Sequence, residues 1–413
     1  MTDRVRTDWS SPEMRSRVKR RYGAERRFKL LGLSAILLSV GFLAFLLISM
    51  SWNGIGGFME TRVRVTIDFP ASTLMLDPAR VDDAALAAAD IDGALRAAAE
   101  KQYGPAGAGL FSESAWLRLR DEIKADPSVL NGRRDFDLPA VSAIDIAAKG
   151  TGAPDAEAIH ARLAREGAVS RGFDWDFLTG ADATDPAAVG IWGAFKGSLL
   201  TMLVTLALAF PVGVLSALYL EEYAPKNRWT DFIEVSINNL AAVPSIIFGL
   251  LGLAVFLNIM HLPRSAPIVG GLTLALMTMP VIVIAGRNAI KAVPPSVRDA
   301  ALGVGASPLQ VAFHHVLPLA LPGILTGTII GMARALGETA PLLMIGMRAF
   351  IAAPPGGIAD PATVLPVQIF LWSDEVSRGF VEKTSAAILV LLAFLMAMNG
   401  IAIYLRNRFE RRW

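Results

Sequence analysis

The sequence predicts an α-helical integral membrane protein with six transmembrane helices and an extracytoplasmic α+β insert between the first two helices. Three observations support this fold class. The 413 residues are 53% hydrophobic and only 18% charged, with a mean hydropathy of +0.47, whereas soluble domains carry about 25% charged residues. Six separate apolar stretches are each long enough to cross a bilayer. One long acidic segment separates the first stretch from the other five.

The N-terminal segment, residues 1–29, is strongly basic, and its Lys and Arg side chains crowd the approach to the first span. An excess of Lys and Arg beside a span marks its cytoplasmic end. The first span is expected at residues 30–50. Because the polar segment before it is longer than the n-region of a signal peptide, we expect a retained anchor rather than a cleaved signal.

The predicted insert covers residues 51–190 and holds clearly more acidic than basic residues. Apolar residues alternate with polar ones at 62–69, which is typical of a half-buried strand. Further elements are expected as helices at 84–102, 114–124 and 155–166 and as a strand at 135–148. This mixture predicts a small α+β domain on the extracytoplasmic side of the membrane.

The membrane core, residues 191–413, contains the other five spans. These spans are expected at 194–220, 232–257, 267–285, 317–345 and 384–405. An even number of spans places both chain ends on one side of the membrane. The C-terminal tail from Arg406 onward is basic like the N-terminal segment. We therefore expect both ends in the cytoplasm, together with the connectors 221–230 and 287–316.

The expected fifth span contains a regular glycine pattern and an ionic pair. Gly323, Gly327 and Gly331 recur every four residues and predict a smooth helix face for close packing, for gating, or for both. Arg334 and Glu338 also lie four residues apart, so we expect them near the middle of this span and on one side of it. A charged pair at membrane depth indicates a functional site, and the alternative is a structural ion pair that locks two helices.

Arg287 lies at the expected cytoplasmic end of the fourth span. Two interpretations stay open for this residue. It could extend a pathway for anions, or it could be a topology anchor whose charged head reaches the membrane interface.

The connector at 293–318 carries a recognisable motif. It contains Asp299-Ala300-Ala301, then Gly305, then Leu317-Pro318. Pro294 and Pro295 are typical of a helix start, and Gly305 predicts a left-handed turn at the helix end. The pattern resembles the coupling loop (Glu-Ala-Ala, then Gly, then Leu-Pro) of ABC-importer permeases, with Asp299 in place of Glu and His315 where Ile is usual. In that family the loop docks on the ATPase.

Two further segments resemble one branch of these permeases. ARALGETAPLL at 333–343 and AAVPSIIFGLLGLAVF at 241–256 are similar to the PstA-type permease of the phosphate-specific ABC importer. The resemblance covers about residues 190–413 and implies the type I importer fold. It also implies three kinds of protein partner, in addition to membrane lipid: a PstC-like second permease, a PstB-like ATPase dimer, and a PstS-like periplasmic phosphate-binding protein that delivers the substrate.

On this resemblance, the expected function is phosphate import across the cell inner membrane. Arg334 would offer a guanidinium to the anion, since its fork matches phosphate oxygens. Glu338 would pair with Arg334 when the site is empty. Two alternatives stay open: a subunit that signals phosphate status to a cytoplasmic partner, or a permease for another oxyanion.

Several other functions lack the residues that they need. The chain has no Cys, and its four His residues show no metal-binding spacing, so we expect no metal site. It has no phosphate-binding GxxxxGK[ST] loop, so ATP would be used by a partner and no cofactor is expected on this chain. No catalytic residues are expected, because a single Arg–Glu pair does not make an enzyme site. No binding of nucleic acid is expected.

Overall fold

The computed structural model describes residues 11–72, 74, 76–78 and 80–409. The chain divides into two units, residues 1–53 and 54–413, and each is described by itself. Most of the first unit is the helix α1 (Pro12–Gly57), whose 46 residues include the expected first span. Residues 30–48 of this helix are almost all apolar on every side, which is typical of a helix surrounded by lipid or by other helices. Residues 1–10 of the basic segment and 410–413 of the basic tail lie outside the described residues.

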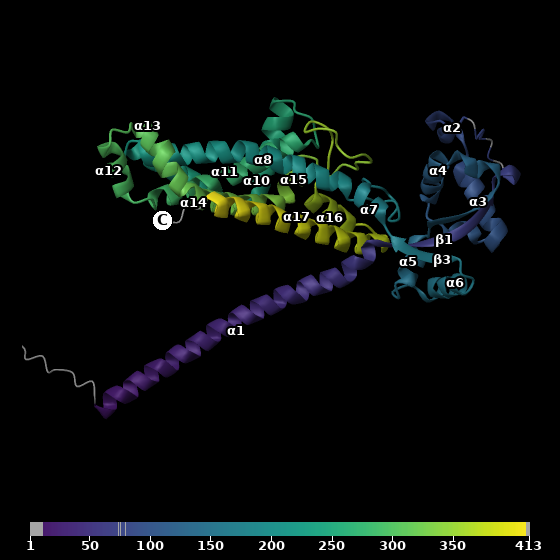
Figure 1. Cartoon of the computed structure of the whole chain (residues 1–413), viewed down its shortest axis with the longest axis horizontal. Coiled ribbons are helices and arrows are strands. Elements are labelled where there is room, and N and C mark those ends of the chain that lie inside the picture. Colours follow the sequence, from purple (N-terminus) through teal and green to yellow (C-terminus); the bar gives the residue numbers. More distant parts are fainter. Residues whose placement is uncertain (1–10, 73, 75, 79, 410–413) are drawn as a thin grey trace, which may run out of the picture. The chain divides into compact units, whose positions relative to one another are not determined.

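The insert is built on a three-stranded antiparallel sheet in the order β2-β1-β3 (Figure 1). The strands are β1 (Met59–Asp68), β2 (Arg133–Pro139) and β3 (Val169–Phe173). The side chains of Val63, Val65 and Ile67 on β1 are fully buried and start the core of the domain. Helices surround the sheet: α2 (Asp83–Ala88), α3 (Ile91–Tyr103), α4 (Ala115–Ala125), α5 (Ser142–Ala148), α6 (Pro154–Arg165) and α7 (Trp175–Thr179). The predicted α+β character is confirmed.

Three details of the insert differ from the sequence prediction. The helix expected at 84–102 is two helices, because the carboxylate of Asp90 accepts the Gly93 N–H and starts a new helix, α3. The strand expected at 135–148 ends at Pro139, and its second half is the helix α5. The strand β3 was not predicted. It is short and lacks a clear alternation of apolar residues.

The membrane core consists of long helices and several short ones. The long helices are α8 (Trp192–Leu218), α11 (Pro267–Lys291), α14 (Leu317–Leu336) and α17 (Gly379–Phe409). The shorter ones are α9 (Arg228–Ala241), α10 (Ser245–Leu251), α12 (Pro295–Gly303), α13 (Pro308–Gln310), α15 (Ala340–Met344) and α16 (Leu365–Ser373). Three π-helical turns extend or precede them: η4 (Tyr219–Tyr223) after α8, η5 (Gly252–Ile259) after α10 and η6 (Val311–Val316) before α14. Figure 1 shows α12 and α13 together at one end of this core.

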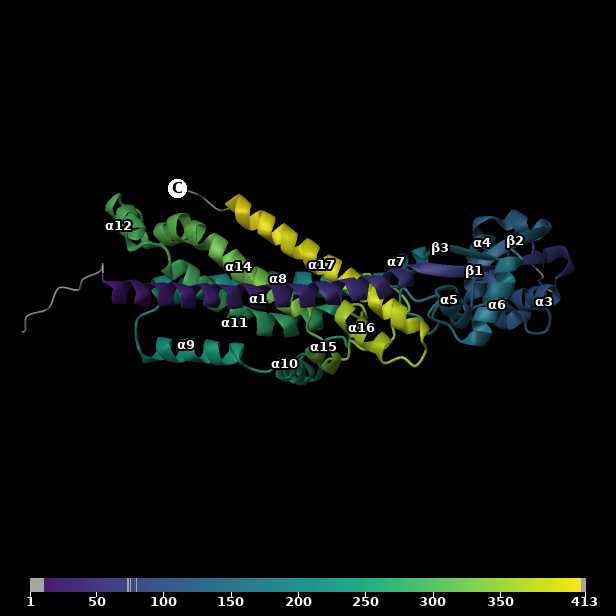
Figure 2. The same ribbon diagram turned by 90° about the horizontal axis from the view of Figure 1, so that it is seen from below.

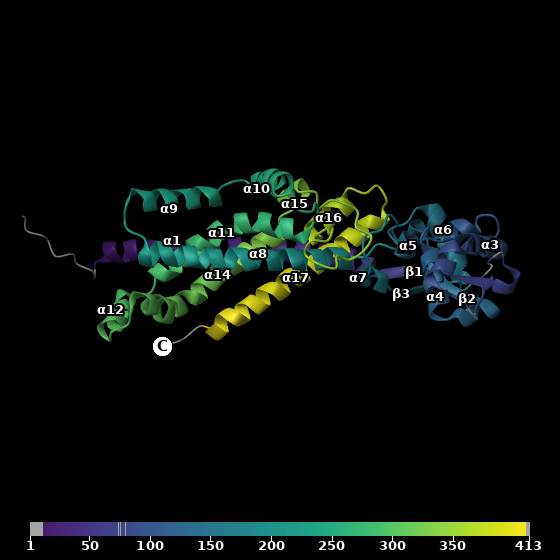
Figure 3. The same cartoon turned by 90° about the horizontal axis from the view of Figure 1, so that it is seen from above.

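Close contacts of small residues show how the core helices run relative to one another. Gly271 packs against Val204 and Gly286 against Ala217, so α8 and α11 run in the same direction. Figure 3 shows the two helices side by side. Because they are parallel, the chain must return across the core between them. The bent pair α9 and α10–η5 makes that return, and it completes six membrane crossings together with the five straight spans.

The third span is not the single helix expected at 232–257. It is broken after α9, and its two parts are bent by 102°. Pro244 accounts for the break, because a proline removes an N–H and disfavours helical geometry at the preceding residue. The fifth span also differs: it begins with η6, before residue 317, and α14 ends at Leu336 instead of continuing to 345.

The glycine face of α14 packs against α11, as the sequence predicted. A Cβ added at Gly327 would lie 2.1 Å from the Cβ of Ala285, and one added at Gly323 would lie 2.7 Å from the Cβ of Ala289. Since the numbering rises along α14 as it falls along α11, the two helices are antiparallel. The face therefore allows close helix contact.

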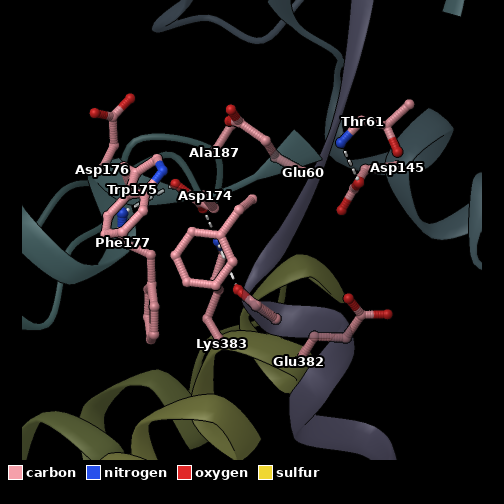
Figure 4. Close-up of polar contacts among 12 residues, drawn as sticks. Glu60, Thr61, Asp145, Asp174, Trp175, Asp176, Phe177, Ala187, Glu382 and Lys383 are labelled. Carbon is pink, nitrogen blue, oxygen red and sulfur yellow. Dashed lines mark hydrogen bonds and ion pairs between the residues drawn. The ribbon is translucent and has the colours of Figure 1, made fainter. Parts of the chain in front are cut away.

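A buried ionic junction joins α17 to the insert (Figure 4). The ammonium of Lys383, near the start of α17, donates to the carboxylate of Asp174 and to the carbonyl of Gly57 at 3.1 Å. Both ionic side chains are almost completely buried. The other oxygen of Asp174 accepts the N–H of Phe177 at 2.9 Å and so caps α7. The junction fixes the first turn of α17 to the start of α7.

Replacing Gly327 with Leu is expected to force α14 and α11 apart. Overpacking a tight contact costs about 1–3 kcal/mol, so the variant should unfold at a lower temperature in detergent. Gly400→Leu is the matched control, since a Cβ at Gly400 meets nothing within 4 Å. Equal unfolding temperatures for the two variants would contradict the close contact.

Replacing Lys383 with Met leaves Asp174 buried and unpaired. Breaking a buried pair in this way costs about 3–5 kcal/mol, so faster proteolysis of the insert and a lower unfolding temperature are expected. The double variant Lys383→Met with Asp174→Asn should recover part of the loss, because Asn still accepts the Phe177 N–H. A double variant less stable than the single one would show that the pair is not the cause.

Candidate functional site

The pair Arg334 and Glu338 lies at a break in the backbone. Arg334 is in the last turn of α14, and Gly337 ends the helix. Glu338 therefore lies beyond the helix, and the prediction that both residues share one side of a continuous span is wrong. The new helix α15 begins at Ala340, with Pro341 in its first turn, where a proline fits best. A Gly followed four residues later by a Pro is the sequence signal for this break.

Arg334 and Glu338 still approach each other across the break. The Nε of Arg334 lies 3.5 Å from the Oε1 of Glu338, which is longer than a good N–H···O bond. The side chain of Arg334 is 49% exposed on this chain, and that of Glu338 is 18% exposed. The pair is therefore loose, and the guanidinium keeps donors free for another acceptor.

The packing of α14 on α11 shows at which level along α11 the pair Arg334 and Glu338 lies. Gly331 contacts Thr278, near the middle of α11. Arg334 lies three residues further along α14, about 4.5 Å at 1.5 Å per residue. Arg334 is thus at the end of its own helix but close to the middle of the neighbouring one. The expectation of a central position in its own span is wrong, while a central depth relative to α11 follows from the contact.

The short helix α10, which follows the break in the third span, packs against α15, which follows the break after α14. A Cβ added at Gly249 on α10 would lie 2.7 Å from the Cα of Pro341 on α15, so the two short helices are in close contact. Figure 2 shows α10 and α15 side by side. Non-helical backbone at membrane depth is tolerated only where it is buried in protein or lines a water-filled cavity. Two adjacent interrupted helices are also typical of binding sites in transporters.

Arg287 occupies a different environment at the other end of α11. It is 8% exposed and donates to Glu221 on η4 and, at 2.7 Å, to Glu234 on α9. Its charge is already balanced by two carboxylates, so it is not an open anion site in this conformation. The sequence analysis did not identify Glu221 or Glu234 as partners, because nothing in their local pattern links them to a residue more than fifty positions away.

The connector between α11 and α14 adopts the predicted local structure. The helix α12 begins at Pro295 after Pro294. Gly305 has a φ of +90°, which confirms the expected left-handed turn and favours glycine. Within α12, Asp299 and Ala300 are exposed while Ala301 is buried. Leu317 and Pro318 open α14.

An open, mostly apolar groove of about 770 Å³ lies beside this connector. Its lining includes Ala300 and Ala301 of α12, His315 of η6 and Pro318 of α14. The small Ala side chains leave this space free. The arrangement can accept a protruding element of a partner between α12 and the start of α14.

Comparisons with protein families match two parts of the chain. A family described as binding-protein-dependent transport system inner membrane component matches residues 209–413. A domain of unknown function, DUF3333, matches residues 15–158, which include most of α1 and most of the insert.

Individual relatives match the membrane core. The phosphate transport system permease protein PstA of Yersinia pestis is 30% identical over 218 residues, which are 52% of this chain and 72% of the relative. PstA 1 of Mycobacterium tuberculosis (strain CDC 1551 / Oshkosh) is 33% identical over 178 residues, which are 43% of this chain and 58% of the relative. This chain spans 57–58% of the length of several other relatives.

An inward-facing MetNI methionine ABC transporter is 17% identical, with a TM-score of 0.39, over 54% of this chain and 95% of that chain.

Proposed function

This chain belongs to the family of PstA-type permeases of ABC importers, and from this premise we propose that it moves inorganic phosphate into the cell. The observation that carries the proposal is the position of Arg334. Its guanidinium is half-exposed at the depth of the middle of α11, beside an interrupted helix. A cation at the centre of a bilayer costs about 2.5–3.5 kcal/mol on insertion scales, so this side chain faces water or another protein instead of lipid.

The pathway for phosphate runs along one face of this chain and not through its interior. Arg334 is on that face, so a PstC-like second permease would close the pathway from the other side. A guanidinium binds phosphate oxygens through two parallel, charge-assisted hydrogen bonds. The free donors of Arg334 fit that role, because its bond to Glu338 is long.

Glu338 has two roles in this mechanism. When no anion is bound, it balances the charge of Arg334 and prevents an unpaired cation at membrane depth. When HPO₄²⁻ binds Arg334, the carboxylate accepts a hydrogen bond from the protonated oxygen of the substrate. A fully deprotonated oxyanion such as sulfate lacks this donor, so Glu338 favours phosphate.

In this proposal Arg287 lies at the cytoplasmic exit of the same pathway. It can receive an anion only after one of its two glutamate partners has moved away. Between transport events it holds α11 to η4 and α9.

Energy for transport comes from other chains. A PstB-like ATPase dimer docks on the connector, where Asp299, Ala300, Ala301 and Gly305 form the contact helix and its terminal turn, and Leu317 and Pro318 lead the movement into α14. A PstS-like periplasmic protein delivers phosphate on the opposite side. This orientation places the insert in the periplasm and both chain ends in the cytoplasm of a cell with an inner membrane.

The role of Arg334 can be tested with Arg334→Gln. Two charge-assisted bonds of about 1.5–3 kcal/mol each would be lost, so uptake of labelled phosphate into vesicles should fall about a hundredfold or more. Co-purification of the partner subunits should be unchanged.

Arg96→Gln is the matched control for that measurement. Arg96 and Asp92 form an exposed pair with the same four-residue spacing in the insert, so this variant should transport normally. Normal uptake by Arg334→Gln would remove Arg334 from the pathway. A wild-type complex that responds to phosphate without moving any would favour a signalling subunit instead.

A further inference from the structure

The π-helical turn η4 at the end of α8 carries two adjacent glutamates that bond different helices. Glu221 accepts from Arg287 on α11. Glu222 accepts from Arg298 on α12, the helix of the connector. Single π-helical turns occur frequently at functional sites. Here the turn directs neighbouring carboxylates toward two separate elements.

Arg298 makes a bidentate bond to Glu222 and also holds the end of α11. Its Nη2 donates to the Oε1 of Glu222 at 2.7 Å, and its Nε donates to the Oε2 of the same carboxylate at 3.3 Å. The same guanidinium donates to the carbonyls of Val293 at 2.7 Å and Ile290 at 3.0 Å. The Arg298 and Glu222 side chains are 23% and 13% exposed. A bidentate pair of this kind fixes geometry as well as charge.

The same π-helical turn touches the other limb of the connector. The hydroxyl of Tyr223 lies 3.4 Å from the carbonyl of Pro308, which opens α13. Adjacent residues of η4 therefore contact both α12 and α13. The end of α8 is held between the two limbs of the connector.

This arrangement matters because the connector does not directly follow or precede α8 in the chain. The connector joins α11 directly to α14, so its movement reaches both helices through the backbone. For α8 the contacts must be non-covalent, through packing on α11 and α14 or through η4. We propose that the Glu222–Arg298 ion pair makes α8 follow the connector, and that Arg298 is a positioning residue for coupling. This inference rests on the proposed docking of an ATPase on the connector.

The first test measures geometry and does not depend on transport. The chain has no Cys, so two spin labels can be placed without other changes, one at Lys226 beyond η4 and one at Ser296 on α12. Both positions are exposed. In the assembled complex, the distance distribution between the labels should be narrow. Glu222→Gln should broaden it, while Asp92→Asn in the insert should not.

The second test measures coupling as phosphate moved per ATP hydrolysed. Coupling free energies between sites correspond to about 5–150-fold, so Glu222→Gln should lower this ratio about fivefold or more. It leaves the bonds from Arg298 to Val293 and Ile290 in place, and so it isolates the ion pair. The charge exchange Glu222→Arg with Arg298→Glu should recover part of the ratio relative to Glu222→Arg alone.

Two outcomes would overturn the inference. If Glu222→Gln changes neither the distance distribution between the labels nor the amount of phosphate moved per ATP hydrolysed, the pair does not link α8 to the connector. If only Arg298→Gln has an effect, Arg298 acts by capping α11. A wild-type complex that moves no phosphate would reject the proposed function, and the spin-label result would still decide whether the link exists.

Discussion

Interrupted helices inside a membrane leave backbone N–H and C=O groups without intrahelical partners, and this constraint shapes the core. One break separates α9 from α10 at Pro244, and the other separates α14 from α15 after Gly337. The short helices that follow, α10 and α15, pack on each other through Gly249 and Pro341. Non-helical backbone is therefore gathered in one region of the core. That region is where a polar pathway can exist without exposing unsatisfied groups to lipid.

The position of Arg334 follows from the same constraint. The helix α14 approaches α11 through its glycine face and ends one turn beyond the contact between Gly331 and Thr278. The guanidinium is thus carried to the break by a tightly packed helix. At its other end, α14 begins at the connector, which Arg298 joins to Glu222 on η4. In the mechanism that we propose, a displacement of the connector is transmitted toward the break through these closely packed helices.

Much of this fold could be predicted from the sequence because hydropathy, proline and glycine act locally. The approximate positions of the apolar spans, the start of α12 at Pro295 and the left-handed turn at Gly305 follow from neighbouring residues. Pro341 indicates the break after α14, but the apolar residues on both sides of it favoured the prediction of one continuous span at 317–345. Apart from the pair Arg334 and Glu338, whose members lie four residues apart, the ionic contacts could not be predicted. Lys383 and Asp174 are 209 positions apart, and only the assembled fold brings such side chains together.

We propose that the break after α14 lines a water-filled path for phosphate near the middle of the membrane. A single cysteine at Thr339, within the break, tests it directly in this cysteine-free chain. The complete complex would be treated with a charged, membrane-impermeant thiol reagent, with and without phosphate. We predict that the thiol reacts and that phosphate slows the reaction while sulfate does not. A thiol that stays unreactive in every nucleotide state, or that reacts equally with and without phosphate, would contradict the claim.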